Sequence, residues 1–255
     1  MNLSILMTFT LSKSKSKRIL KVLSLVLGIC FLCVIALVYF QPMFAVRWLA
    51  KKDPEVLYFV NTRAKVVALT IDDGPNAIVT PQILDVLKEH SSRATFFLIG
   101  ENIPGNQYLL ERMRLEGHEL GNHLGRDFAS IRLLPEDFER ELIEVDKMLA
   151  LNGRQKWFRP GSGFYNQRML EQARANGYRC SLASVYPHDT VVRNSWIAFH
   201  YITQKVFPGA IIVLHDGKAD RVRTVEVLKR VLPKLRQQGY EVVTLSELAS
   251  YEEGS

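Results

Sequence analysis

The chain has 255 residues, of which 47% are hydrophobic and 23% are charged, a composition that excludes a disordered chain and can supply a hydrophobic core. Its net charge of +7 does not indicate nucleic-acid binding, because five basic residues lie before residue 22 and 28 basic residues face 26 acidic ones after it. The length suits one domain of α/β barrel size or two small ones.

The first predicted element is an apolar helix over residues 22–40, directly after the basic cluster. At about 1.5 Å per residue, such a helix spans roughly the ~30 Å hydrocarbon core of a bilayer. We therefore expect a basic cytoplasmic segment over residues 1–18 and one transmembrane anchor over residues 19–41, with the rest of the chain outside. A cleaved signal peptide is the alternative, but its apolar region is typically only ~7 to 15 residues long.

The three cysteines give little information about the location of the chain. Cys30 and Cys33 lie in the apolar segment, and only Cys180 lies in the remainder, so no disulfide is expected within the predicted domain. The predicted location outside the cytoplasm therefore depends on the anchor alone.

Strands and helices alternate after a predicted juxtamembrane linker over residues 42–63. Thr80 and Pro81 predict the cap and first turn of the first helix in this region. The alternation favours a single α/β domain of barrel type over residues 64–250. The expected strands include 66–71, 94–99, 119–121 and 157–159, the expected helices include 82–90, 108–116 and 135–151, and the alternation continues through 166–176, 178–184, 196–206, 210–214, 224–238 and 241–245.

Asp72 and Asp73 follow the first buried strand and form the most informative pair in the sequence. Adjacent carboxylates raise each other's pKa unless a cation lies beside them or the two acids have different partners. A solvated turn is the alternative for the Asp-Asp-Gly sequence alone. Other polar residues also follow predicted strands, and the carboxyl ends of barrel strands share one face, so we expect these residues to converge in one site. They are His123, Asp127, Arg159, Asp189, His215 and Asp216.

Five short motifs, in order, resemble those of the polysaccharide deacetylases, the carbohydrate esterase family 4 enzymes built on the NodB homology domain. The resemblance covers roughly residues 64–248. It implies a distorted (β/α) barrel, which would follow the transmembrane helix, and a metal-dependent deacetylase. The motifs are Thr70–Pro75 (TIDDGP), Gly117–His123 (GHELGNH), Phe158–Gly163 (FRPGSG), Tyr186–Thr190 (YPHDT) and Ile212–Asp216 (IVLHD).

The resemblance also implies catalytic roles for four of these residues. Asp72 would be the general base toward the attacking water, and Arg159 would orient it. His215 would be the general acid that protonates the leaving amine, and Asp189 would orient His215 and favour its charged form. Asp216 is interpreted as a turn residue rather than a catalyst.

The implied metal ligands are Asp73, His123 and Asp127, which would hold one divalent cation. Most relatives have a second histidine where this chain has Asp127, four residues after His123. A helical turn with this spacing would place both side chains on one face. One histidine and two carboxylates make a harder site, so we predict a shift in preference from Zn²⁺ towards Mn²⁺, Co²⁺ or Fe²⁺.

The resemblance further implies that the Ser162 N–H donates to the oxyanion and that Leu214 lines the pocket for the acetyl methyl group. Thr190 and the Gly161-Ser162 pair replace bulkier residues of the family and leave the identity of the glycan open. The predicted substrate is an N-acetylated polysaccharide, either peptidoglycan or a chitin-like polymer. The alternatives are an inactive, membrane-anchored glycan-binding relative and an amidase with a non-sugar substrate. The sequence leaves the oligomeric state open.

Overall fold

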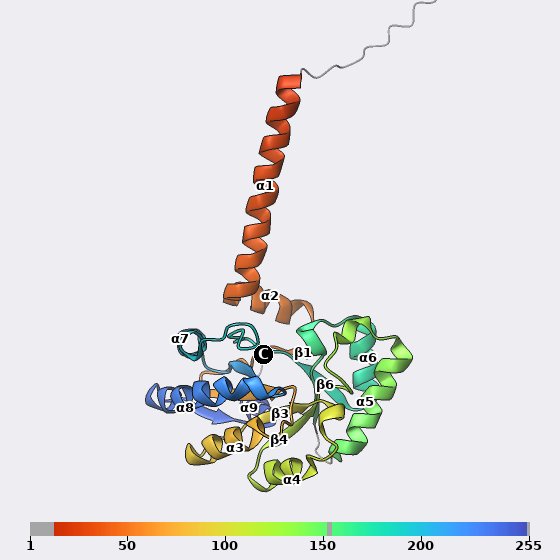
Figure 1. Ribbon diagram of the computed structural model, residues 1–255, viewed down its shortest axis with the longest axis vertical. Coiled ribbons are helices and arrows are strands. Elements are labelled where there is room, and N and C mark those ends of the chain that lie inside the picture. The colour runs from red at the N-terminus through yellow and green to blue at the C-terminus, as the bar shows by residue number, and fades with distance from the viewer. Residues whose placement is uncertain (1–12, 152–154, 254–255) are drawn as a thin grey trace, which may run out of the picture. The chain divides into compact units, whose positions relative to one another are not determined.

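The computed structural model describes residues 13–151 and 155–253. The chain divides into two compact units, Met1–Ala45 and Val46–Ser255 (Figure 1). The first unit contains α1 (Lys13–Phe40), and α2 (Met43–Lys52) begins in the first unit and ends in the second. All the strands of the described residues belong to the second unit.

A curled sheet of eight parallel strands forms the centre of the second unit (Figure 1). Its order within the described residues is β1-β6-β5-β4-β3-β2-β7, and β8 pairs with the beginning of β2. Several of these strands are buried along their whole length, which explains their continuous apolar runs. The strands are β1 (Val56–Leu57), β2 (Val66–Asp72), β3 (Thr95–Leu98), β4 (Glu119–Asn122), β5 (Lys156–Phe158), β6 (Tyr178–Ser181), β7 (Ile211–His215) and β8 (Glu241–Val243).

The two edges of the sheet approach each other without forming a complete barrel. The segment after β1 reaches the start of β7 through a bridge between Phe59 and Ala210, and the segment after β6 reaches β7 through a bridge between Val185 and Ile212. The sheet is therefore a curled half-barrel, and the predicted barrel-like α/β fold is confirmed in this form.

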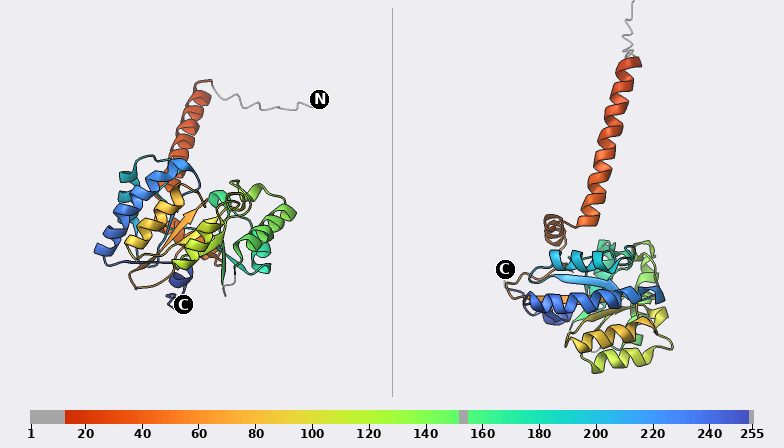
Figure 2. Two further views of the ribbon diagram at one scale, coloured as in Figure 1. Left: turned by 60° about the horizontal axis from the view of Figure 1, so that its bottom comes forward. Right: turned by 60° about the vertical axis from the view of Figure 1, so that its left-hand side comes forward.

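The helices of the second unit pack apolar faces against the sheet and against one another. Helices α3 and α8 lie side by side, and α7 packs on α8 (Figure 2). In α8, apolar residues three or four positions apart, including Val225, Leu228 and Leu232, are buried in the main core. The helices are α3 (Val79–Glu89), α4 (Gln107–Leu115), α5 (Pro135–Leu149), α6 (Gln167–Ala175), α7 (Ser195–Lys205), α8 (Val222–Gln237) and α9 (Leu245–Ala249).

The start of α3 differs from the prediction. The helix begins at Val79, and Ile78 at the N-cap position provides no side-chain cap. The Asn76 side-chain oxygen, two residues earlier, accepts hydrogen bonds from the N–H groups of Ile78 and Val79. Thr80 lies inside the first turn, and its hydroxyl donates to Asp216. The predicted cap was therefore wrong, and Thr80 instead links α3 to the end of β7.

Two short α-helices and one short strand were not predicted. Helix α2 and strand β1 lie in the region predicted as a linker, and α9 follows β8. Strand β1 has only two residues, too few to show an alternating pattern in the sequence. It is a strand because it pairs with β6. The second compact unit therefore begins at Val46, before the predicted boundary at residue 64.

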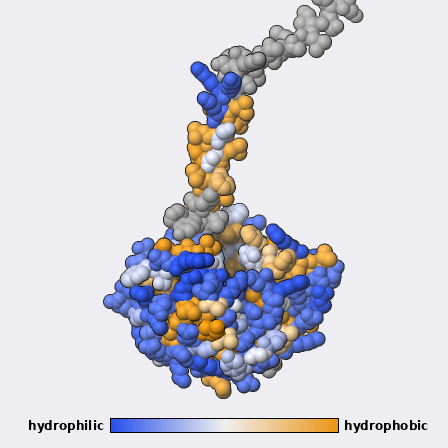
Figure 3. Space-filling model, in the orientation of Figure 1, coloured by the Kyte–Doolittle hydropathy of each residue, from blue (hydrophilic) through white to orange (hydrophobic). Residues whose placement is uncertain are grey.

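Helix α1 exposes many large apolar side chains (Figure 3). The described part of the chain contains no helix that has both the length and the apolar character of a membrane span, so the predicted anchor over residues 19–41 is not shown. The exposed apolar residues of α1 are Leu20, Val22, Leu23, Leu25, Val26, Leu27, Ile29, Phe31, Leu32 and Val34.

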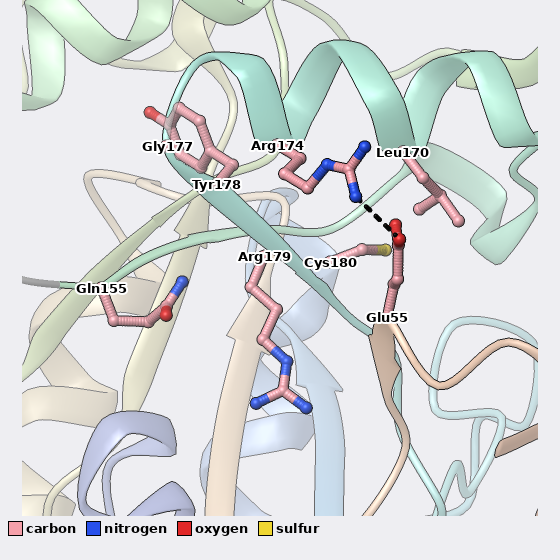
Figure 4. A pocket seen from close by; sticks show the side chains of 8 residues that line it. All are labelled: Glu55, Gln155, Leu170, Arg174, Gly177, Tyr178, Arg179 and Cys180. Carbon is pink, nitrogen blue, oxygen red and sulfur yellow. Dashed lines mark hydrogen bonds and ion pairs between the residues drawn. The ribbon is translucent and has the colours of Figure 1, made fainter. Parts of the chain in front are cut away.

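A cavity of about 480 Å³ lies beside β6 and α6. The ion pair between Arg174 and Glu55, 3.1 Å long, crosses one side of it (Figure 4). None of the predicted site residues lines this cavity, so it is separate from the candidate site. Its lining residues are Glu55, Gln155, Leu170, Arg174, Gly177, Tyr178, Arg179 and Cys180.

Candidate active site

The predicted site residues gather at the carboxyl ends of neighbouring strands. Asp72 ends β2 and His215 ends β7, and the two are paired in the parallel register of these strands. His123 follows β4, and Arg159 follows β5. The expected convergence of polar residues at one edge of the sheet is therefore confirmed for these four residues.

Asp72 and Arg159 form a buried ion pair. The Asp72 Oδ1 atom lies 2.7 Å from Arg159 Nη1, and the two side chains are 5% and 4% exposed. Arg159 also donates to the Thr70 hydroxyl and to the carbonyl oxygen of Ser181, while its guanidinium lies over the ring of Phe97. These contacts fix the guanidinium, so a charge-assisted hydrogen bond holds the Asp72 carboxylate in one orientation.

Asp73 points to a different partner, because its backbone adopts a left-handed conformation with φ 76°. Its Oδ1 lies 3.4 Å from His123 Nε2. Burial raises the pKa of Asp73, but the contact with His123 and the positive charges of His123 and His215 outweigh burial and bring this pKa to about 2. The two adjacent carboxylates thus avoid the predicted conflict, since each faces its own cation.

His123 is oriented by the backbone of the neighbouring strand end. Its Nδ1–H donates to the carbonyl oxygen of Arg159 at 2.7 Å, so Nε2 faces Asp73. Burial lowers the pKa of His123, but the contact with Asp73 and the charge of Asp72 outweigh burial and raise it. A backbone acceptor on one ring nitrogen is the usual support for a histidine that binds a metal through the other.

Asp73 and His123 fit two ligands of one divalent cation. Metal–ligand bonds of about 2.0–2.1 Å at a near-tetrahedral angle place the two donor atoms about 3.3–3.4 Å apart, close to the 3.4 Å between Nε2 and Oδ1. A carboxylate oxygen and an imidazole nitrogen are ordinary donors for Zn²⁺, Mn²⁺, Co²⁺ and Fe²⁺. The described residues contain no group of three or more His, Cys, Asp or Glu that could hold a metal.

Asp127, the third predicted ligand, does not join Asp73 and His123. Its carboxylate pairs with Lys218 Nζ at 3.0 Å, and the two side chains are 56% and 60% exposed. The predicted three-ligand set is therefore not assembled in this structure.

The position of Asp127 follows from the backbone after β4. The prediction assumed a helical turn, but Leu124 is left-handed, with φ 66°, and residues 125–128 form bends. The Arg126 guanidinium in this loop donates hydrogen bonds to the Glu141 carboxylate. Without a helical turn, the four-residue spacing does not place His123 and Asp127 on one face.

His215 and Asp189 form a second histidine–carboxylate pair. His215 Nδ1 lies 2.9 Å from Asp189 Oδ1, and the His215 backbone N–H donates to the other carboxylate oxygen. Burial lowers the pKa of His215, but the charge and the hydrogen bond of Asp189 outweigh burial and raise this pKa to about 9. The imidazole is therefore protonated at neutral pH and can act as a proton donor.

Asp216 has a structural position that sequence reasoning missed. It follows β7 as a turn residue would, but it is fully buried, and burial raises its pKa to about 7. Its backbone N–H donates to the carbonyl oxygen of Asp72, and its carboxylate accepts from the Thr80 hydroxyl and lies against Gly74. Asp216 therefore fixes the turn after β2; its position directly after His215 at the end of a buried strand was the available signal.

Ser162 and Leu214 lie where the motifs place them. Ser162 is exposed and left-handed, with φ 64°, and the neighbouring Gly161 N–H donates to the Ser130 hydroxyl. A Cβ on Gly161 would meet the carbonyl oxygen of Phe128, so this loop is held close to the loop after β4. Leu214 is fully buried in β7. Their roles in oxyanion and acetyl binding stay predictions.

Four of the seven non-glycine residues with left-handed backbone in the described part of the chain lie in or beside the motif segments. Asp73, Leu124, Ser162 and His188 are non-glycine residues with φ between 56° and 76°. Such conformations are uncommon and cluster at active sites, where the surrounding fold holds them. Each of the four lies in or directly after a motif segment or beside a predicted site residue.

Comparison with known proteins identifies a matching family model and several similar proteins. A family model described as polysaccharide deacetylase matches residues 59–181. A peptidoglycan-N-acetylglucosamine deacetylase of Bacillus cereus is 35% identical over 204 residues, which cover 77% of this chain and 93% of the relative. A chitooligosaccharide deacetylase of a Bradyrhizobium species is 30% identical over 82% of this chain and 98% of its own.

Solved structures show the same fold. The peptidoglycan N-acetylglucosamine deacetylase Bc1960 has a TM-score of 0.73 and 28% identity over 78% of this chain and 95% of its own. BA3943 of Bacillus anthracis, a family 4 pseudoenzyme, has a TM-score of 0.70 and 26% identity over 78% and 70% of the two chains. A family 4 acetyl xylan esterase of Clostridium thermocellum, in complex with a cobalt ion, has a TM-score of 0.67 and 26% identity over 73% and 91%.

Proposed function

Because this chain belongs to the polysaccharide deacetylase family, we propose that it removes acetyl groups from N-acetylglucosamine-type residues of a glycan, either peptidoglycan or a chitin-like polymer. The peptidoglycan and chitooligosaccharide deacetylases among its relatives hydrolyse N-acetyl amides. The observation that carries the proposal is the grouping of Asp72, Asp73, His123 and His215, each with its own charged partner, at one edge of the sheet.

Asp72 is the proposed general base. Arg159 fixes its carboxylate through a 2.7 Å contact, and the buried position limits competition from bulk water. The carboxylate would take a proton from the water that attacks the amide carbon. Holding the base in one orientation reduces the entropy that must be lost before the attack.

His215 is the proposed general acid. It lies beside Asp72 in the strand register and is protonated at neutral pH because Asp189 raises its pKa. It would give its proton to the amide nitrogen as the carbon–nitrogen bond breaks, which releases acetate and an amine. The Ser162 N–H is the proposed donor to the oxyanion.

Asp73 and His123 would hold the divalent cation that this family uses. When bound, the cation would polarise the amide carbonyl and lower the pKa of water from about 16 to about 7. We further propose that the site prefers Mn²⁺, Co²⁺ or Fe²⁺ over Zn²⁺ if Asp127 becomes the third ligand, because a second carboxylate makes the ligand set harder. The position of Asp127 is thus decisive for the identity of the metal.

An inactive glycan-binding protein is the less favoured alternative. Its motivation is the altered second, third and fourth motifs. A binding protein would not need a buried Arg159–Asp72 pair beside a protonated histidine, since burying charges costs free energy unless they are well paired. The oriented pairs therefore favour catalysis.

Location outside the cytoplasmic membrane is a further proposal. It is supported by the basic cluster that precedes the apolar residues 22–40 and by the exposed apolar side chains of α1, whose contact with water is unfavourable. Insertion into a bilayer would remove these side chains from water. Membrane fractionation of the full chain tests the proposal, and recovery of the full chain in the soluble fraction would contradict it.

The deacetylase proposal is tested by acetate release from N-acetylglucosamine oligomers and from peptidoglycan. Asp72→Asn should lower kcat by about 10²- to 10⁴-fold, the usual contribution of a general base. Asp137→Asn is a matched control, because Asp137 also pairs with an arginine, Arg140, but on the surface of α5. Equal acetate release by the Asp72→Asn variant and the wild type would refute the assigned base.

A further inference from the structure

Lys218 places a positive charge beside the candidate metal site. Its ammonium pairs with Asp127 at 3.0 Å and so joins the loop after β7 to the loop after β4. Asp127 is the carboxylate that stands four residues after His123, at the position that the resemblance assigns to the third metal ligand. The Lys218 ammonium thus pairs with Asp127, the carboxylate that is predicted from the sequence to bind the metal.

The loop that carries Lys218 is fixed against the other ligand, Asp73. A Cβ on Gly217 would lie 2.5 Å from the Asp73 Cβ, so the two backbones are in close contact. Asn76 Nδ2 also donates to the carbonyl oxygen of Gly217. Lys218 is therefore anchored next to Asp73, and the charges of Asp127 and Asp73 raise the pKa of its ammonium.

We propose that Lys218 is a built-in competitor of the divalent cation: it holds Asp127 away from Asp73 and His123, and the Asp127 carboxylate becomes available as a third ligand only when this ion pair opens. The proposal rests on the metal site of the proposed function and adds a control on its affinity. It assigns Lys218 a positioning role through Asp127.

The strength of the pair suits a competitor rather than a permanent block. Both side chains are more than half exposed, and exposed ion pairs typically change an equilibrium by a factor of only about two to five. A divalent cation can displace an interaction of this size, while the cost still lowers the apparent metal affinity. The same exposure means that replacing Lys218 should leave the fold intact.

The test measures the metal affinity of the chelator-stripped full chain for Co²⁺ and for Zn²⁺, by competition with a chromophoric chelator. Lys218→Met should bind the metal about two- to fivefold more tightly than the wild type at low salt. The gain should shrink at high salt, since an exposed pair is screened. Lys229→Met is the matched control, because Lys229 forms a similarly exposed ion pair with Glu226 on α8, and the metal affinity of this variant should equal that of the wild type.

A double-mutant cycle identifies the partner. With Asp127→Asn present, Lys218→Met should give a much smaller gain, because Lys218 then has no carboxylate to withhold. Wild-type or weaker affinity in the Lys218→Met variant, or an equal gain with and without Asp127, would overturn the proposal while leaving the Asp73–His123 site standing. Absence of metal binding in every variant would overturn both the proposal and the metal dependence of the proposed function.

Discussion

At the scale of single residues, the Asp72–Asp73 pair shows how one backbone angle separates two charges. The left-handed conformation of Asp73 turns its carboxylate towards His123, while Asp72 remains in the strand and faces Arg159. Asp tolerates this conformation better than most residues. Two like charges that are neighbours in sequence thus obtain two different cationic partners, as a base and a ligand would require.

The first prediction concerns the pH dependence that His215 confers. Because its pKa is raised to about 9, its protonated form, and hence kcat/KM, should persist at neutral pH and fall as the pH rises through this value. Asp189→Asn removes the charge that raises the pKa, so the alkaline limb of the profile should move to lower pH. An alkaline limb at the wild-type pH in this variant would contradict the assignment of His215 as the acid.

The second prediction concerns the buried carboxyl of Asp216. Its folded-state pKa of about 7 lies above the ordinary value, so its contribution to stability is present at low pH and is lost as the pH rises towards and through 7. Asp216→Asn should remove this loss and gain about 1–4 kcal/mol relative to the wild type between pH 5 and pH 8. Denaturant unfolding at several pH values measures it; a parallel pH dependence in both proteins would refute it.

At the scale of elements, the loops after β2, β4 and β7 decide which side chains meet. The turn after β2 is held by Asn102, whose side chain donates to the Asp73 carbonyl oxygen, and by the close approach of Gly217. The loop after β4 is held instead by contacts of Glu141 with Gly125 and Arg126. These contacts fix Asp73 and leave Asp127 turned towards Lys218.

The third prediction uses the contact between Gly217 and Asp73. A methyl group in Gly217→Ala would overlap the Asp73 backbone and displace the ligand, so metal affinity should fall by about tenfold or more. Gly105→Ala is the control, because it introduces strain at φ 83° in open space and should lower stability without changing metal affinity. Equal metal affinity of the Gly217→Ala variant and the wild type would show that the contact does not position Asp73.

The sequence predicted those parts of the fold that depend on local pattern. Buried strands such as β2 and amphipathic helices such as α8 have periodic apolar residues, so their existence and order could be read directly. Strand β1 and the role of Thr80 could not, because they depend on the pairing of β1 with β6 and on the contact between Thr80 and Asp216, whose partners lie far apart in sequence.

The candidate site shows the same division. The pairs Asp72–Arg159 and His215–Asp189 were expected from strand ends and from the resemblance, and the structure brings each pair together. Asp127 could not be placed from spacing, because the left-handed Leu124 interrupts the assumed turn. Lys218 had no signal at all, since its importance arises only from the meeting of two loops.

At the scale of the whole molecule, the second unit contains the candidate site and large hydrophobic clusters of the curled sheet. The fourth prediction follows from this: a chain that starts at Val46 should fold with the Tm of the full chain and retain its kcat for soluble oligomers. The measurement compares thermal unfolding and acetate release of the two proteins. Loss of either property would show that residues 1–45 contribute to the catalytic unit.

The most direct test of the central claim is acetate release from N-acetylglucosamine oligomers by the full chain, measured after chelation and during titration with divalent metal. The account predicts negligible release from the chelated protein and recovery that saturates at one ion per chain, with kcat of Asp72→Asn about 10²- to 10⁴-fold below that of the wild type at every metal concentration. Undiminished release by the metal-free protein, or release by the metal-loaded Asp72→Asn variant at the wild-type rate, would contradict a metal-dependent deacetylase built on Asp72, Asp73 and His123.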